Sequence, residues 1–91
     1  MILPILTLAQ LLDIRDKSSG YVLEVASNGP CVVHRAGCSA IGMETFLNRV
    51  VVNRGRAGGY LYGGDMRSTL AEAGSDALLC AECHRSHVEA P

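Results

Sequence analysis

The chain has 91 residues, with ten glycines and four cysteines, and a formal net charge of −1. This length allows one domain, and 48% hydrophobic against 19% charged residues excludes a disordered chain. The charge excludes a uniformly basic nucleic-acid binder, and no apolar run approaches the ~20 residues that span a bilayer. With one Phe, three Tyr and no Trp the core is small, so we expect a metal, a disulfide or a partner chain to stabilise it.

The apolar start of the chain lacks the positive charges and the cleavage site of a secretory signal, so we expect a cytoplasmic protein. Thiols stay reduced in that compartment, so clustered cysteines indicate metal or redox chemistry there and not structural disulfides.

The first predicted element is a helix over residues 8–17. Thr7 and Gln10 form a capping-box pattern before it, and Gly20 follows its end. Leu8, Leu11 and Leu12 share one face, which is a candidate docking surface for a protein partner.

A β-hairpin is predicted next. Residues 21–25 and 31–34 alternate or run apolar, and the Asn28-Gly29 pair between them favours a tight turn.

The middle of the chain has weaker patterns. They indicate a short helix within residues 39–48, a strand over residues 50–52, a flexible loop over residues 53–59 and a second strand over residues 60–62.

Two helices are predicted near the end. Thr69 and Glu72 form a second capping-box pattern, which opens a short helix that Gly74 ends, and a last helix runs from Cys80 through Val88. The predicted class is α+β: one zinc-stabilised domain over residues 1–91, with an N-terminal helix in residues 1–20 and a zinc-binding core in residues 21–91.

Two pairs of metal-binding side chains carry the chemistry. His34 and Cys38 are four residues apart, and Cys80 and Cys83 are three apart. Such pairs deliver two ligands each to a tetrahedral zinc ion, and Gly37 would let the chain turn between the first two. Because the second pair would sit on the first turn of the last helix, the arrangement is treble-clef-like, and we predict Zn²⁺ bound by all four residues.

Three other residues compete as ligands. Cys31 could replace His34 or face the core beside Val33, and His84 and His87 lie next to the second pair. We expect Cys31 to pack in the core and the two histidines to face solvent.

Residues 80–84 read Cys-Ala-Glu-Cys-His, the attachment pattern of a c-type haem, with Met43 or Met66 as a distal ligand. An electron carrier is therefore an alternative, although haem attachment takes place outside the cytoplasm. A thioredoxin-like redox role is a weaker alternative, because the cysteine pair does not follow a first strand.

The segments Val33-His-Arg-Ala-Gly-Cys38 and Cys80-Ala-Glu-Cys83, with Ala71, Ala73 and Gly74 between them, resemble the zinc-binding domain of the Ada DNA-repair proteins and its relatives fused to nucleases. The resemblance spans roughly residues 31–85. It implies a small mixed α/β domain that holds zinc. The repair members of that family move a methyl group from a DNA phosphotriester onto a zinc-bound cysteine. His34 stands where that family has its first cysteine, and imidazole cannot take over the thiolate's role.

The predicted function is a non-catalytic structural-zinc domain that binds a macromolecule, because four protein ligands leave no open position on the metal. Nucleic acid is the first candidate partner, and protein–protein interaction or homodimerisation through Leu61 or the leucine face of the first helix is the alternative. The predicted nucleic-acid surface is a set of basic and aromatic residues around a Gly-rich loop: Arg49, Arg54, Arg56, Tyr60, Tyr62 and Arg67. Alternatively, the arginines are ordinary solvated surface residues and the two tyrosines pack against a small sheet.

Overall fold

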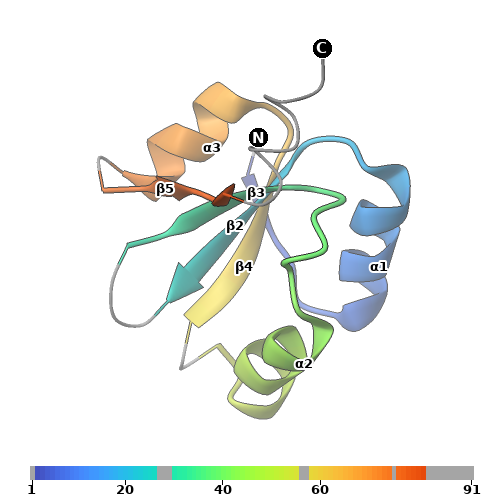
Figure 1. Ribbon diagram of the computed structural model, residues 1–91. Helices are drawn as coiled ribbons and strands as arrows, with labels where there is room; N and C mark the ends of the chain where they lie inside the picture. The colour runs from blue at the N-terminus through green and yellow to red at the C-terminus, as the bar shows by residue number, and fades with distance from the viewer. Residues whose placement is uncertain (1, 27–29, 56–57, 75, 82–91) are drawn as a thin grey trace.

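The computed structural model describes residues 2–26, 30–55, 58–74 and 76–81. This part of the chain forms a five-stranded sheet in the order β1-β4-β2-β3-β5, with helices around it (Figure 1). The elements in chain order are β1 (Ile2–Pro4), α1 (Leu8–Lys17), β2 (Tyr21–Ala26), β3 (Val32–Arg35), α2 (Met43–Phe46), the π-helix η1 (Leu47–Val52), β4 (Gly58–Gly63), α3 (Met66–Ala73) and β5 (Leu78–Leu79). The α+β class is confirmed.

Helix α1 has the predicted bounds and the predicted cap. The Thr7 hydroxyl accepts a hydrogen bond from the Gln10 backbone N–H at 3.2 Å, and the Gln10 side chain accepts one from the Thr7 N–H at 3.0 Å. Leu11 is fully buried while Leu12 is 44% exposed. The predicted leucine docking face is therefore wrong for Leu11, which belongs to the core.

The predicted hairpin is confirmed as the antiparallel pair of β2 and β3, in which Val22 lies opposite His34. The Asn28-Gly29 turn lies outside the described residues. Strand β4, which contains the predicted residues 60–62, pairs with β2 on its other side, so that Glu24 lies opposite Tyr60. Strand β1 was not predicted; it is three residues long and pairs with β4.

The predicted strand over residues 50–52 is wrong, because these residues end the π-helix η1 that continues α2. The Asn53 N–H donates to the Asn48 carbonyl, and one turn earlier the fully buried Phe46 ring packs against Tyr60 with centroids 5.3 Å apart. These tertiary contacts outweigh the preference of valine for strands.

Helix α3 begins earlier than the Thr69 pattern indicates. Its N-cap is Asp65, whose carboxylate accepts a hydrogen bond from the Ser68 N–H at 2.7 Å, while the end at Gly74 agrees with prediction. Thr69 is fully buried against the sheet, and a Cβ at Gly63 would collide with its hydroxyl. Thr69 therefore packs the helix onto β4 and does not cap it.

The two faces of the sheet have different covers. Helix α3 contacts β1, β2, β3 and β4 on the face that includes Gly63. The opposite face carries the main core, in which α1 and the segment after β3 pack on the sheet; its buried members are Ile5, Leu11, Val22, Cys38, Ile41, Phe46, Tyr60 and Cys80. Among the described helices, none is long and apolar enough to cross a bilayer.

Candidate metal centre

Strand pairing brings the first two components of the site together from distant parts of the sequence. Strand β5 runs parallel to β3 with Val33 beside Leu79, and the Cys80 N–H donates to the Val33 carbonyl at 2.9 Å. This register places Cys80 next to His34, 46 positions earlier in the chain. His34 and Cys80 each directly follow a member of the Val33–Leu79 pair. Residues opposite each other in paired strands point to the same face of the sheet, so both side chains enter the main core.

The third component, Cys38, comes from a turn after β3. The Cys38 N–H donates to the Arg35 carbonyl at 3.0 Å, and its sulfur accepts a hydrogen bond from the Ala40 N–H at 3.4 Å. A Cβ at Gly37 would lie 2.8 Å from the Ser18 hydroxyl oxygen, so a larger residue here would require the Ser18 side chain to move. The φ of Gly37 is not left-handed, so the expected special turn conformation is not the reason for this glycine.

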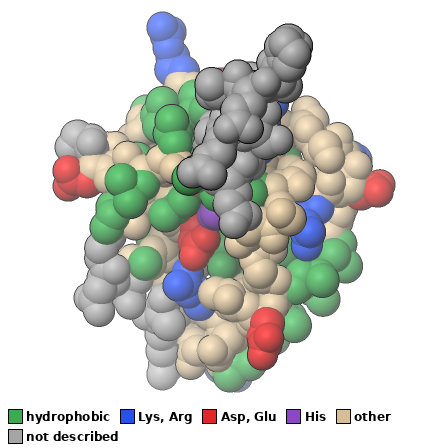
Figure 2. Space-filling model, viewed as in Figure 1, with side chains coloured by type: hydrophobic (Ala, Val, Ile, Leu, Met, Phe, Trp, Pro, Cys, Tyr) green, Lys and Arg blue, Asp and Glu red, His purple; other side chains and the backbone are tan. Residues whose placement is uncertain are grey.

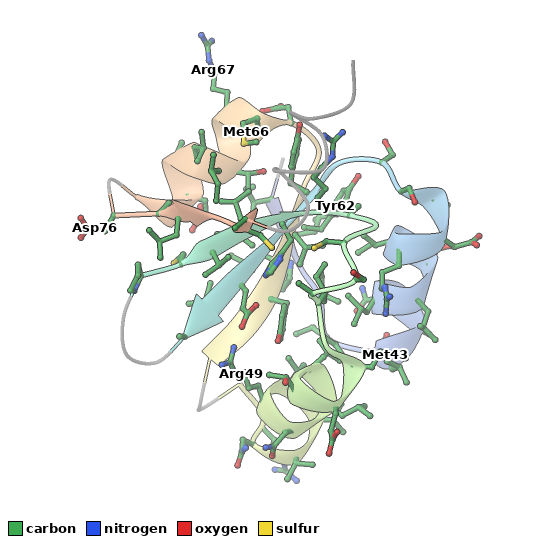
Figure 3. All side chains as sticks on the ribbon, viewed as in Figure 1. Met43, Arg49, Tyr62, Met66, Arg67 and Asp76 are labelled. Carbon is green, nitrogen blue, oxygen red and sulfur yellow. The ribbon has the colours of Figure 1, made fainter. Side chains whose placement is uncertain are left out.

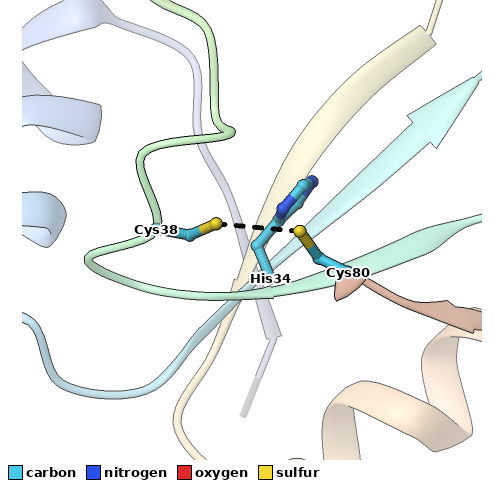
Figure 4. A group of neighbouring side chains, drawn as sticks. All are labelled: His34, Cys38 and Cys80. Carbon is cyan, nitrogen blue, oxygen red and sulfur yellow. Dashed lines mark hydrogen bonds between the residues drawn. The ribbon is translucent and has the colours of Figure 1, made fainter. Parts of the chain in front are cut away.

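His34, Cys38 and Cys80 form one buried cluster in which the candidate ligand atoms all lie within 4.8 Å of one another. Their exposed fractions are 3%, 5% and 8%. The two sulfurs are 3.7 Å apart and are not joined by a disulfide. The dashed line in Figure 4 marks this contact. This group could hold a metal ion, and three of the four predicted ligands are thus brought together.

The remaining predicted ligand, Cys83, lies outside the described residues, as do His84 and His87. Cys31 is described and does not join the cluster. It is half-buried beside Pro30, Ala73 and Asp76, so it is neither a replacement for His34 nor the fully buried core residue that we expected.

Glu24 contacts His34, and Arg49 contacts Glu24 in turn. Nε2 of His34 lies 2.8 Å from one Glu24 carboxylate oxygen, and an Arg49 guanidinium nitrogen donates to the other at 2.7 Å. Nδ1 of His34 is buried and has no hydrogen-bond partner among the described residues. Sequence reasoning missed Glu24; the available signal was a single carboxylate in the apolar strand Tyr21–Ala26, in phase with His34.

The electrostatics of the metal-free cluster follow from these contacts. Burial alone would lower the pKa of His34, but the hydrogen bond to Glu24 and the nearby Cys80 sulfur outweigh it and raise that pKa. The His34 hydrogen bond is the main cause that lowers the pKa of Glu24; burial opposes it and Arg49 assists it. Burial raises the pKa of the Tyr60 hydroxyl.

The residues of the predicted nucleic-acid surface do not form one patch. Arg49 is paired with Glu24, and Tyr60 is only 3% exposed, so neither is available as predicted. Arg67 projects outward from α3, whereas Arg49 lies far from it beside η1 (Figure 3) and reaches toward Glu24. Tyr62 is half-buried and its hydroxyl donates to the Ser19 carbonyl at 2.9 Å.

Two arginines of that set remain. Arg54 is exposed, has a left-handed φ of 52°, and lines a hollow whose other walls are mostly apolar. Arg56 lies outside the described residues. Figure 2 shows basic, acidic and apolar side chains interspersed on the visible face, with no continuous basic stripe.

The orientation of Cys80 disfavours the haem alternative. A thiol bonded to haem must face the haem, whereas the Cys80 sulfur faces Cys38 inside the core.

A scan against protein-family models, a search of curated proteins and a search of solved structures all gave no match for this chain. The similarity to Ada-like zinc domains therefore stays a prediction from residues 31–85.

Proposed function

We propose that this chain is a structural zinc domain in which His34, Cys38 and Cys80 are three of the ligands. The observation that carries the proposal is the convergence of one imidazole and two thiols in a buried cluster within 4.8 Å. Two of these side chains come from β3 and its following turn, and the third comes from the far end of the described chain.

The donor set favours zinc over other common cations. Calcium and magnesium prefer oxygen ligands, whereas thiolate with imidazole is the usual combination at structural zinc. Two thiolates bound to one tetrahedral zinc, each at about 2.3 Å, lie about 3.8 Å apart. The two sulfurs of Cys38 and Cys80 are 3.7 Å apart, which matches this requirement.

Cys83 completes the proposed coordination on the strength of its spacing from Cys80 alone. A fourth protein ligand closes the metal to substrates, so the proposed centre is structural and not catalytic. If Cys83 were absent from the metal, water would fill the fourth position and the site would be open. Cys83→Ser separates these cases, because a closed site loses one thiolate while an open site is unchanged.

The proposed role of the ion is to fasten the edge of the sheet. Strand β5 has two residues, and within the described part of the chain it pairs with β3 alone. A metal bond from Cys80 to His34 and Cys38 would anchor this strand to the core, and the binding energy would become folding energy.

The test is native mass spectrometry of the protein as purified, followed by cobalt substitution. We expect one zinc per chain, and a thiolate-to-cobalt absorption band that shrinks in Cys38→Ser and in Cys80→Ser. Cys31→Ser is the matched control, because it removes a thiol outside the cluster and should leave the metal and the band unchanged. A metal-free wild type, or equal loss in the control, would contradict the proposal.

Nucleic-acid binding is the proposed activity of the domain's surface, now centred on Arg54. This guanidinium is exposed beside Gly55 and Gly58, where the absence of side chains lets a phosphate come close. Because Arg49 is neutralised by Glu24, we expect few phosphate contacts and a shallow salt dependence, with a slope near −1 per contact.

A mobility-shift titration with single-stranded and duplex DNA at two salt concentrations tests this activity. Arg54→Ala should abolish the shift, and Arg67→Ala, at the other end of the molecule, is the matched control. If no shift occurs in the wild type, the result favours the protein-interaction alternative. The surface to test is then the exposed apolar side of α2 and η1, which consists of Met43, Leu47 and Val51.

A further inference from the structure

We propose that Glu24, held in place by Arg49, is a positioning residue that fixes the tautomer of His34 and so makes Nδ1 the metal-binding atom. This inference rests on the proposed zinc site and adds two residues to it that no ligand motif indicates. Figure 2 shows histidine, acidic and basic side chains in a row near the centre of the visible face. Glu24 contacts both His34 and Arg49.

The hydrogen bond between Glu24 and His34 decides which ring nitrogen is free. A neutral imidazole has one N–H and one lone pair, and a carboxylate can only accept. Since the Glu24 oxygen lies 2.8 Å from Nε2, the ring proton stays on Nε2 and the lone pair is on Nδ1. One ring nitrogen of His34 faces the two sulfurs and the other points away from them (Figure 4).

The burial of Nδ1 points to the same atom. This nitrogen is buried and has no hydrogen-bond partner among the described residues, which is an unfavourable arrangement when nothing occupies the lone pair. A metal ion between His34, Cys38 and Cys80 would occupy it. The orphaned atom and the thiol cluster are therefore explained by one ligand.

Arg49 keeps the carboxylate in this orientation. Its guanidinium donates to the second Glu24 oxygen at 2.7 Å, and both side chains are about three-quarters shielded from water, with exposed fractions of 25% and 22%. Arg49 comes from η1, Glu24 from β2 and His34 from β3. Three elements thus converge behind one ligand, as outer-shell groups do in metal sites that fix a histidine.

Strand register makes the contact possible. Val22 lies opposite His34, and Glu24 is two residues further along β2, so Glu24 and His34 are diagonal neighbours on one face. A long acidic side chain reaches across this diagonal, and aspartate at the same position would be one methylene too short.

The first experiment reads the tautomer directly. In zinc-loaded, ¹⁵N-labelled protein, long-range ¹H–¹⁵N spectra should show His34 with a protonated Nε2 and a metal-bound Nδ1. Metal bound through Nε2 in the wild type would overturn the inference while leaving the zinc proposal intact. A wild type without zinc would overturn both.

The second experiment measures zinc affinity by competition with a chromophoric chelator. Glu24→Gln should weaken zinc binding about 10–100-fold, and Arg49→Met should weaken it less, because Glu24 remains. Glu72→Gln, an exposed change on α3, is the matched control and should leave the affinity unchanged.

A purely structural role for Glu24 makes a different forecast. In that case Glu24→Gln would lower the melting temperature of the metal-free protein but leave zinc affinity and the Nδ1 coordination as in the wild type. That result would contradict the inference.

Discussion

The histidine–cysteine cluster and the arginine–tyrosine set were both predicted as sites from sequence, yet the fold treats them in opposite ways. His34, Cys38 and Cys80 converge in one buried group. Arg49 and Tyr60 turn inward to Glu24 and Phe46, and Arg67 projects from the far side of α3. Ligands of one metal ion must converge on a single point, so their spacing in the sequence is informative. Arginine and tyrosine side chains that are close in sequence can instead make internal contacts, as Arg49 and Tyr60 do.

The largest effect that would break this comparison is removal of the metal. Chelation at neutral pH should abolish cooperative unfolding or lower the stability by several kcal/mol, because the binding energy of structural zinc is folding energy. Circular dichroism melting with and without chelator measures it. If the melting temperature is the same with and without chelator, the cluster is an ordinary group of buried thiols and not a metal site.

Tyr60→Ala should give the next largest effect, about 3 kcal/mol of lost stability, because it removes a nearly fully buried ring that packs on Phe46. Tyr60→Phe keeps the ring and should cost about 1 kcal/mol or less. Urea denaturation of both variants distinguishes a core residue from a base-stacking one. Equal stability of Tyr60→Ala and wild type would restore Tyr60 to the surface set.

Cys31→Ala sharpens the contrast within the cysteines themselves. Its side chain is half-buried and outside the cluster, so we expect a loss of about 1 kcal/mol with full metal retention. Elemental analysis with a denaturation curve checks both parts. Loss of metal in this variant would show that the ligand set has been drawn wrongly.

The cap of the helix that carries Arg67 should show a small pH effect. Hydrogen bonds from Ser68 lower the pKa of Asp65 below its ordinary 3.8. The resulting stabilisation is therefore present above that ordinary value and is lost as pH falls through the folded one. Asp65→Asn keeps a capping oxygen without the titration, so the two melting curves should agree near pH 7 and diverge in acid. Parallel curves down to acid would contradict this role of the carboxylate.

Arg67→Ala should give the smallest effect, within about 0.5 kcal/mol, because the side chain is exposed on the outer side of α3. Thermal melting and the DNA titration should both match wild type. A large loss of DNA binding in this variant would show that Arg67 and Arg54 belong to the same binding surface.

Local signals explain which parts of the fold could be predicted. The Thr7–Gln10 cap and the apolar run of the hairpin act within a few residues, and α1, β2 and β3 follow them. Strand β1 exists only through its pairing with β4, some 58 residues later, and no pattern of three residues predicts it. Val50–Val52 reads as a strand by composition, but the contacts of Phe46 and Arg49 hold this segment in a helix.

The candidate site divides in the same way. Ligand spacing identified His34, Cys38 and Cys80, because a knuckle needs its two donors close in sequence. Glu24 and Arg49 could not be found so, since their contact with His34 depends on strand register and on the η1 helix. Thr69 shows the opposite error: a local cap pattern was present, but Asp65 caps the helix and Thr69 packs against Gly63.

The parallel pairing of β5 with β3 has a consequence for biosynthesis. A ribosome that has released residues up to 77 has delivered the hairpin, α3 and two thirds of the described donor cluster, but the outer edge of β3 is still bare and Cys80 is missing. A nascent or truncated chain of that length presents an unpaired strand edge to chaperones and proteases, and that edge is covered only once residues 78–80 have emerged and paired with β3.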